Sequence, residues 1–362
     1  MPLMRVCRLP LPLVLLLTLA SVSRAGIIAD YSNDGGFFTT NSAAKVAIER
    51  AIFDINAVIS SSFTAIPAAP RTVVGAAGTN GRTTATFTHS LAYSNPSTGA
   101  TTTYTGGLAA NEIRIFVGAR NLTANTLGQG GPGGIGLGIS TSSFSSTELT
   151  AALASATLQS NTIYGRGGDG PVIGQLSTSI DGNSVLINYG NTIGNLWFDQ
   201  DTNNDGSTDT SPLLDSFWNF DPDATSFGNK ADFYSVALHE TLHAIGFGTS
   251  KTWDDLINNV GDWTGANAIA AAGTGNLLAG AEDFAHIASG ILSHRLDGTG
   301  LQETVMAPSI VLGTRKKLTE LDVAFLRDIG FRTTAVPEPG TILLVSVVFV
   351  GGVVARRRRV AA

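Results

Sequence analysis

One segment, His239-Glu240-Thr241-Leu242-His243-Ala244-Ile245-Gly246-Phe247-Gly248, contains the pattern H-E-x-x-H. On a helix, positions i and i+4 project from the same face, so the imidazoles of His239 and His243 can reach one metal ion. A catalytic zinc ion has three protein ligands and keeps one position open for water. The pattern therefore predicts a zinc-dependent hydrolase, in which Glu240 is the general base that takes a proton from this water.

The residues around this pattern favour a helix. Asp232 or Ser235 can cap its start, and Gly246 can end it in a left-handed conformation. A second helix is predicted from Asn41 or Ser42 to about Ile59, because its apolar residues recur at helical spacing.

A further helix is predicted near the end of the chain. Thr319 and Asp322 form a pair like that of a capping box, and Leu318 can pack on Val323 at the helix start. The helix is expected to end at Gly330 and to act as a packing element.

The first 25 residues are typical of an export signal. Arg5 and Arg8 precede the apolar run Leu9 to Ala20, and Ser23-Arg24-Ala25 forms a small-residue cleavage site. The run is short for a membrane span and contains prolines, so a cleaved signal is preferred over a permanent anchor.

The last residues, 336–362, contain Val336-Pro337-Glu338-Pro339-Gly340, an apolar run over 341–355, and the basic cluster Arg356 to Arg359. They resemble the PEP-CTERM sorting tail of exported bacterial proteins. The resemblance implies a partner, a membrane protease of the exosortase type, and release to the cell surface or exterior after transient anchoring in the inner membrane. A span of about 20 apolar residues is comfortable, and this run is shorter. A simple C-terminal anchor is the alternative.

The composition agrees with a location outside the cytoplasm. The single cysteine, Cys7, lies in the signal, so the mature chain can form no disulfide and has no thiolate to block a zinc site. Seven arginines and one glutamate lie in residues 1–25 and 338–362, which leaves 15 basic and 27 acidic residues and a net charge of −12. An acidic body argues against nucleic-acid binding.

We expect residues 26–335 to form one α+β catalytic domain, with an N-terminal lobe over 26–248 and a C-terminal lobe over 249–335. Alternating segments rich in Thr, Val and Ile predict strands. These segments are Arg71 to Val74, Thr83 to Leu91, Ile113 to Val117 and Val185 to Tyr189.

A glycine-rich stretch over 128–138 separates two of these strands. Gly131, Gly133 and Gly136 fit G-x-G-x-x-G, but Pro132 and the absence of a clear following helix argue against a nucleotide fingerprint. We expect a surface loop here.

The acidic stretch over 199–209 resembles a calcium loop. Asp201, Asn203, Asp205 and Gly206 take the first, third, fifth and sixth positions of the twelve-residue pattern, and Asp209 adds an oxygen ligand. Pro212 stands at the twelfth position, where a bidentate acid is required. An ordinary acidic turn is therefore the preferred interpretation, with a structural calcium site as the alternative.

The third zinc ligand is not given by the helix. In the pattern H-E-x-x-H-x-x-G-x-x-H a third histidine follows, but Thr249 stands at that position. The ligand must come from elsewhere in the chain. The candidates are His286, His294, Glu282, Asp254, Asp255 and Asp262, together with His89 upstream in a predicted strand.

Three later segments carry a resemblance: Ser293 to Gly298, Thr304 to Pro308 and Leu318 to Phe331. The Val-Met-x-Pro turn and the L-T-x-x-D helix resemble the end of matrixin-like metzincins. Residues 232–331 are similar to a family of exported, PEP-CTERM-tagged bacterial zincin metalloproteases. The resemblance implies His294 as the third zinc ligand and Met306 as the Met-turn residue beneath the metal.

For the fold, the resemblance implies a zincin or metzincin-like domain, with a twisted mixed sheet, an active-site helix and a mostly irregular or helical C-terminal lobe. The expected function is a zinc-dependent endopeptidase that hydrolyses protein or peptide substrates. A substrate chain would pair with an edge strand, for which Ile113 to Val117 is the candidate. The alternative is a zincin scaffold without catalysis, serving as a matrix or adhesion protein in the extracellular polysaccharide or biofilm.

Overall fold

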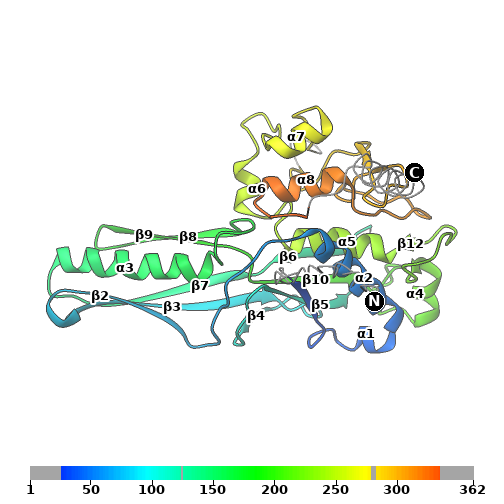
Figure 1. Cartoon of the computed structure of the whole chain (residues 1–362). Helices are drawn as coiled ribbons and strands as arrows, with labels where there is room; N and C mark the ends of the chain where they lie inside the picture. Colours follow the sequence, from blue (N-terminus) through cyan, green and yellow to red (C-terminus); the bar gives the residue numbers. More distant parts are fainter. Residues whose placement is uncertain (1–25, 124, 279–282, 335–362) are drawn as a thin grey trace, which may run out of the picture.

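The computed structural model describes residues 26–123, 125–278 and 283–334. The export signal, the sorting tail with its apolar run over 341–355, and Glu282 lie outside these residues. The chain has a mixed α+β architecture with several sheets (Figure 1), as the sequence predicted. No helix in the described ranges is both long and apolar enough to cross a membrane.

The central sheet has the strand order β1-β5-β10-β6. The strands β1 (Gly26–Asp30), β5 (Glu112–Arg120) and β10 (Ile193–Asp199) run parallel, and β6 (Gly128–Pro132) joins antiparallel to β10. The prediction that Ile113 to Val117 form an edge strand is wrong. These residues lie in β5, which pairs with a neighbour on both sides, and the edge strands of this sheet are β1 and β6.

Two helices cover one face of this sheet. Helix α2 (Ser42–Val58) and helix α5 (Phe233–Ala244) pack against each other and against the apolar residues of β5 and β10. Both were predicted from the sequence, and Asp232 is the N-cap of α5. The short helices α1 (Phe37–Thr40) and α4 (Ser211–Phe217) and the strand pair β11 (Trp218–Asn219) and β12 (Ala231–Asp232) surround this core.

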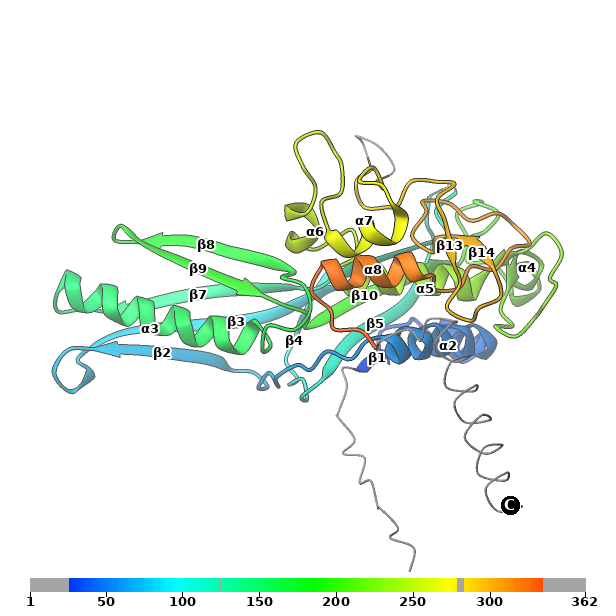
Figure 2. The same cartoon turned by 45° about the horizontal axis from the view of Figure 1, so that its top comes forward.

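An elongated arm projects from the central sheet (Figures 1 and 2). Strand β3 (Thr83–Ser94) pairs with β2 (Arg71–Ala77), with β7 (Gly134–Ser142) and, at its end, with β4 (Thr101–Tyr104). A 3-10 turn at Thr79–Gly81 joins β2 to β3. Helix α3 (Ser146–Tyr164) packs between these strands and the hairpin of β8 (Gly174–Ile180) and β9 (Asn183–Tyr189). The arm has its own apolar core.

The prediction that the glycine-rich stretch forms a surface loop is wrong. Its residues form β6 and the first part of β7. The glycines of β6 allow a close approach to α5. A Cβ atom added to Gly130 would lie 2.1 Å from the main-chain oxygen of Glu240, and one added to Gly128 would lie 3.0 Å from its Cγ. Backbone contact at this distance requires glycine.

The stretch over 199–209 is an acidic turn. The Asp201 carboxylate accepts hydrogen bonds from the backbone of Asp205 and Gly206, and the Asp209 carboxylate accepts two from Thr202. These acids are not among the clustered groups that could hold a metal ion in the described part of the chain. The turn is therefore held by its own side chains, and the alternative of a structural calcium site stays a prediction.

The C-terminal segment lies on the side of α5 opposite the sheet (Figure 2). It contains the helices α6 (Lys251–Asp255), α7 (Ala266–Ala272) and α8 (Glu320–Asp328) and the hairpin of β13 (Leu292–His294) and β14 (Leu301–Glu303). The predicted capping box of α8 is present at Thr319 and Asp322. Trp253, Trp263 and Phe325 pack together in the same apolar core as α2 and α5.

Candidate metal centre

Helix α5 is fixed at both ends. The Asp232 carboxylate accepts hydrogen bonds from the backbone and hydroxyl of Ser235, and Arg315 forms an ion pair with it. At the other end Gly246 has a φ of 111°, a conformation that favours glycine. This glycine ends the helical course of the chain three residues after His243.

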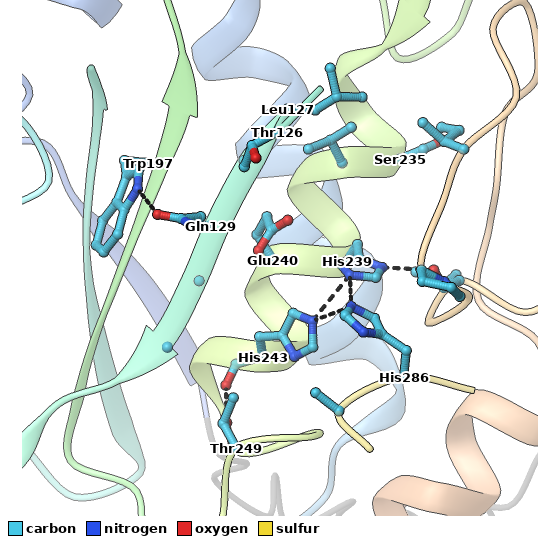
Figure 3. A pocket seen from close by; sticks show the side chains of 18 of the residues that line it. Thr126, Leu127, Gln129, Trp197, Ser235, His239, Glu240, His243, Thr249 and His286 are labelled. Carbon is cyan, nitrogen blue, oxygen red and sulfur yellow. Dashed lines mark hydrogen bonds between the residues drawn. The ribbon is translucent and has the colours of Figure 1, made fainter. Parts of the chain in front are cut away.

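Three histidines converge at one point (Figure 3). The Nε2 atoms of His239, His243 and His286 lie 3.1 Å from one another in each of the three pairs. The first two rings project from one face of α5, as the i and i+4 spacing predicted, and the third comes from the C-terminal segment. These residues form the group that could hold a metal ion in the described part of the chain.

The outer nitrogen of each ring has an acceptor. His239 Nδ1 lies 2.9 Å from the carbonyl oxygen of Val305, and His243 Nδ1 lies 2.8 Å from that of Phe247. His286 Nδ1 lies 2.9 Å from both carboxylate oxygens of Asp283. Carbonyl and carboxylate oxygens only accept, so each Nδ1 carries a proton.

A neutral imidazole with a proton on Nδ1 has a lone pair on Nε2. Three such lone pairs face one another in the cluster, so the short contacts between the Nε2 atoms are not hydrogen bonds in the neutral state. Burial and the neighbouring histidines lower the pKa of His239 well below its ordinary value, and burial together with His286 lowers the pKa of His243 to about 4. The neutral form is the one that ligates metals.

The spacing of the three nitrogens fits a small divalent cation. A tetrahedral zinc ion, with Zn–N distances of about 2.0–2.1 Å, separates its nitrogen ligands by about 3.3 Å. The observed 3.1 Å is close to this value. Three neutral imidazoles, each with a hydrogen-bonded outer nitrogen, are a set of donors that suits zinc.

The structure does not bring His294 to this cluster. His294 is an exposed residue at the end of β13, where it pairs with Leu301 of β14, and His286 occupies the third position instead. The expectation for His294 came from the resemblance and is corrected here. His286 was among the candidates that the spacing left open, and Glu282 lies outside the described residues. The other candidates, His89, Asp254, Asp255 and Asp262, lie outside the cluster.

Glu240 is buried beside the histidines. Its carboxyl group projects between β6 and the cluster (Figure 3), and only 8% of the residue is exposed. Burial raises the pKa of Glu240 to about 8, and a hydrogen bond with the backbone of Gly130 opposes this shift. A carboxyl group of this kind holds a proton more readily than an exposed glutamate.

The cluster opens into a cleft of about 780 Å³. Strand β6 forms one wall, and the residues of α5 from Ser235 to His243 form its base. The opposite wall follows the turn over 305–310. The buried Lys316 also lines the cleft, and its ammonium group forms an ion pair with Glu303.

The turn opposite β6 contains Met306, which is fully buried. The Asp322 carboxylate accepts hydrogen bonds from the backbone of Val305 and from both the backbone and the hydroxyl of Thr319. Helix α8 therefore holds the turn whose Val305 carbonyl faces His239. The sequence identified this helix as a packing element, and the link to the histidine is a structural finding.

Two parts of the site were missed from the sequence. The first is strand β6, and its signal in the sequence was the glycine run over 128–131, which only Gln129 interrupts. The second is Asp283, three residues before His286, and the D-x-x-H spacing was its signal.

Residues 335–359 match the family model described as the PEP-CTERM protein-sorting motif. This match supports the prediction made from the tail. The comparison with curated proteins returned no match, and neither did the comparison with solved structures. The chain therefore carries the C-terminal motif of exported bacterial proteins that exosortase sorts to the surface.

Proposed function

We propose that the chain is an exported zinc-dependent endopeptidase with a zincin, metzincin-like catalytic domain. The observation that supports this most strongly is the convergence of three Nε2 atoms beside the buried Glu240, at the base of an open cleft. Each part matches a need of peptide hydrolysis. Three neutral ligands leave one position of a zinc ion open for water, and the carboxyl group of Glu240 lies beside the three histidines.

His239, His243 and His286 would hold the zinc ion. When bound, zinc would act as a Lewis acid that polarises a carbonyl group and lowers the pKa of a water molecule. Glu240 takes a proton from the attacking water and passes it to the leaving amine. Its burial raises its pKa toward neutrality, the range that suits a general base.

The edge of β6 is the proposed binding site for the substrate. Its neighbour β10 occupies one side, and the other side lines the cleft. An extended peptide can add to such an edge through main-chain hydrogen bonds.

The sorting tail also suggests the steps by which the protein is exported. We propose that the apolar run over 341–355 anchors the chain briefly in the inner membrane, with the arginine cluster on the cytoplasmic side. Cleavage near Pro337 then releases the domain to the surface or the exterior. The substrate is therefore a protein or peptide outside the cytoplasm.

The test compares the purified protein with Glu240→Gln, which keeps the size of the side chain and removes its basicity. We expect wild-type protein to cleave a denatured fluorescent protein substrate and to contain one zinc ion per chain by elemental analysis. The variant should keep its zinc and lose activity by a factor of at least about 10². Full activity in the variant would remove Glu240 from the mechanism. Wild-type protein that binds zinc but cleaves no peptide in a broad library would favour the non-catalytic adhesion function.

A further inference from the structure

We propose that Asp283 is the positioning residue of the third metal ligand. Both of its carboxylate oxygens lie 2.9 Å from Nδ1 of His286, on the side of the ring opposite the cluster. The contact fixes the proton on Nδ1 and turns Nε2 toward His239 and His243. This inference rests on the proposed metal site.

The third ligand differs from the first two in its support. His239 and His243 are held by the backbone of one helix, and their outer nitrogens face main-chain carbonyl groups. His286 lies outside the helices and strands, and its outer nitrogen faces a side chain. Of the three acceptors that face the outer nitrogens, only the Asp283 carboxylate belongs to a side chain, so it is the one that a substitution can remove.

The backbone around His286 is held independently of Asp283. The amide of Ile287 donates to the carbonyl oxygen of Met306 at 2.8 Å, and the indole of Trp253 donates to that of Phe284 at 2.7 Å. Gly248 allows the segment to approach, because a Cβ atom there would lie 2.1 Å from the oxygen of Ala285. Loss of the carboxylate should thus free the ring while the main chain stays in place.

Asp283 has a second, local contact that the experiment must separate. Its Oδ1 accepts a hydrogen bond from the amide of Ala285 at 3.2 Å, which stabilises the turn. A serine at this position can keep a turn contact of this kind, but its hydroxyl is too short to replace the carboxylate at the imidazole. Asparagine keeps an acceptor for the ring and removes the charge.

The variants are therefore Asp283→Ser, Asp283→Ala and Asp283→Asn in the full chain. The control is Asp255→Ser, a substitution of an exposed aspartate in the same segment that pairs with Lys251 and not with the cluster. The zinc dissociation constant is measured by competition with a chromophoric chelator at pH 7. The melting temperature of the metal-free protein is recorded in parallel.

We expect Asp283→Ser and Asp283→Ala to weaken zinc binding by about 10-fold to 100-fold, the range found when outer partners of metal ligands are removed. Asp283→Asn should recover part of this loss, and Asp255→Ser should bind as wild type does. Either folded variant that lacks the acceptor decides the question. Unchanged zinc affinity in such a variant, with an unchanged melting temperature without metal, would overturn the role of Asp283.

The outcome is separable from the proposed function. Wild-type protein that fails to bind zinc contradicts both the metal site and the role of Asp283. If wild-type protein binds zinc and Asp283→Ala binds it with the same affinity, only the role of Asp283 is contradicted. The measurement needs no substrate, so it does not depend on the cleavage specificity.

Discussion

Gly130 of strand β6 packs directly on Glu240 of helix α5. A Cβ atom at Gly130 would lie 2.1 Å from the main-chain oxygen of Glu240 and 2.8 Å from its carbonyl carbon. Main-chain atoms cannot move aside as a flexible side chain can. The distance between β6 and α5, and so the width of the cleft at Glu240, depends on the absence of this one methyl group.

Gly130→Ala should therefore destabilise the protein and reduce hydrolysis. Overpacking of a filled contact costs about 1–3 kcal/mol, and the displaced helix carries the proposed base. The free energy of unfolding in urea and the rate of hydrolysis of a fluorescent peptide test this expectation.

Gly131→Ala is the matched control. It changes the neighbouring glycine of the same strand, where an added Cβ atom meets nothing within 4 Å. We expect its free energy of unfolding to stay within about 0.5 kcal/mol of the wild-type value, as for a surface substitution. If the two variants lose the same free energy of unfolding, the loss of glycine flexibility, and not the contact with Glu240, would explain the effect of Gly130→Ala.

The local parts of the site were predictable from the sequence, because one helix determines them. His239, Glu240 and His243 lie within about one turn, so the helical geometry alone sets their directions. The capping box at Thr319 and Asp322 is a local pattern of the same kind. The strands β2, β3, β5 and β9 also followed from alternation, but their partners did not.

The third histidine of the cluster could not be chosen from the sequence, since His286 is separated from His243 by 43 positions. Its place depends on tertiary contacts, among them the bond between Ile287 and Met306. The resemblance favoured His294, which the β13 and β14 hairpin holds in another place. The glycine stretch was misread for a related reason: a strand of glycines has no alternating side chains, and only its packing on α5 explains it.

His286→Ala and His294→Ala should separate these two histidines in solution. Loss of His286 leaves a two-nitrogen site, and we expect the zinc affinity to fall by at least about 10³-fold, because three protein ligands characterise catalytic zinc. His294→Ala should keep zinc and activity, since its ring is exposed and outside the cluster. Zinc titration with elemental analysis measures both. A variant His294→Ala that loses zinc would restore the original expectation.

Removal of the metal should lower the stability of the whole domain. A ligand that binds only the folded state stabilises it by about 4 kcal/mol at a thousand times its dissociation constant. Calorimetry with and without a chelator should therefore give a lower melting temperature for the metal-free protein, and added zinc should reverse the change. An identical melting temperature in both samples would mean that the three histidines do not hold zinc under these conditions.

The arm should lose stability in mild acid through His89. Burial lowers the pKa of His89 to about 4, so the folded arm keeps the ring neutral. The unfolded chain has the ordinary value of about 6.5 and binds a proton first. The contribution of His89 is thus present above pH 6.5 and is lost as the pH falls toward 4. Its neighbours Tyr164 and Arg71 do not titrate in this window, because their pKa values lie far above it.

His89→Asn should flatten this dependence. Urea unfolding at pH 7.5 and pH 5 should give a larger difference in midpoint for wild type than for the variant. His294→Asn removes an exposed histidine and serves as the control, with the wild-type difference expected. The same slope in His89→Asn and wild type would assign the acid sensitivity to other groups.

Asp322 joins helix α8 to the turn that orients His239, and its removal should affect both. The buried carboxylate accepts from the backbone and hydroxyl of Thr319 at 2.9 and 2.7 Å and from the backbone of Val305 at 3.2 Å. Hydrogen bonds to a charged group contribute about 1.5–3 kcal/mol each, and their donors are buried here. We expect Asp322→Ala to lower the free energy of unfolding by about 3–5 kcal/mol, because several buried donors lose their acceptor.

The same substitution should weaken zinc binding, because the Val305 carbonyl accepts from His239 Nδ1. Asp322→Asn keeps one oxygen acceptor and should lose less of both properties. Glu320→Ala changes an acid in the same first turn of α8 without touching the turn over 304–308, so it controls for helix capping. If Asp322→Ala loses stability but binds zinc with wild-type affinity, the turn is held by its other contacts and the link from α8 to His239 is absent.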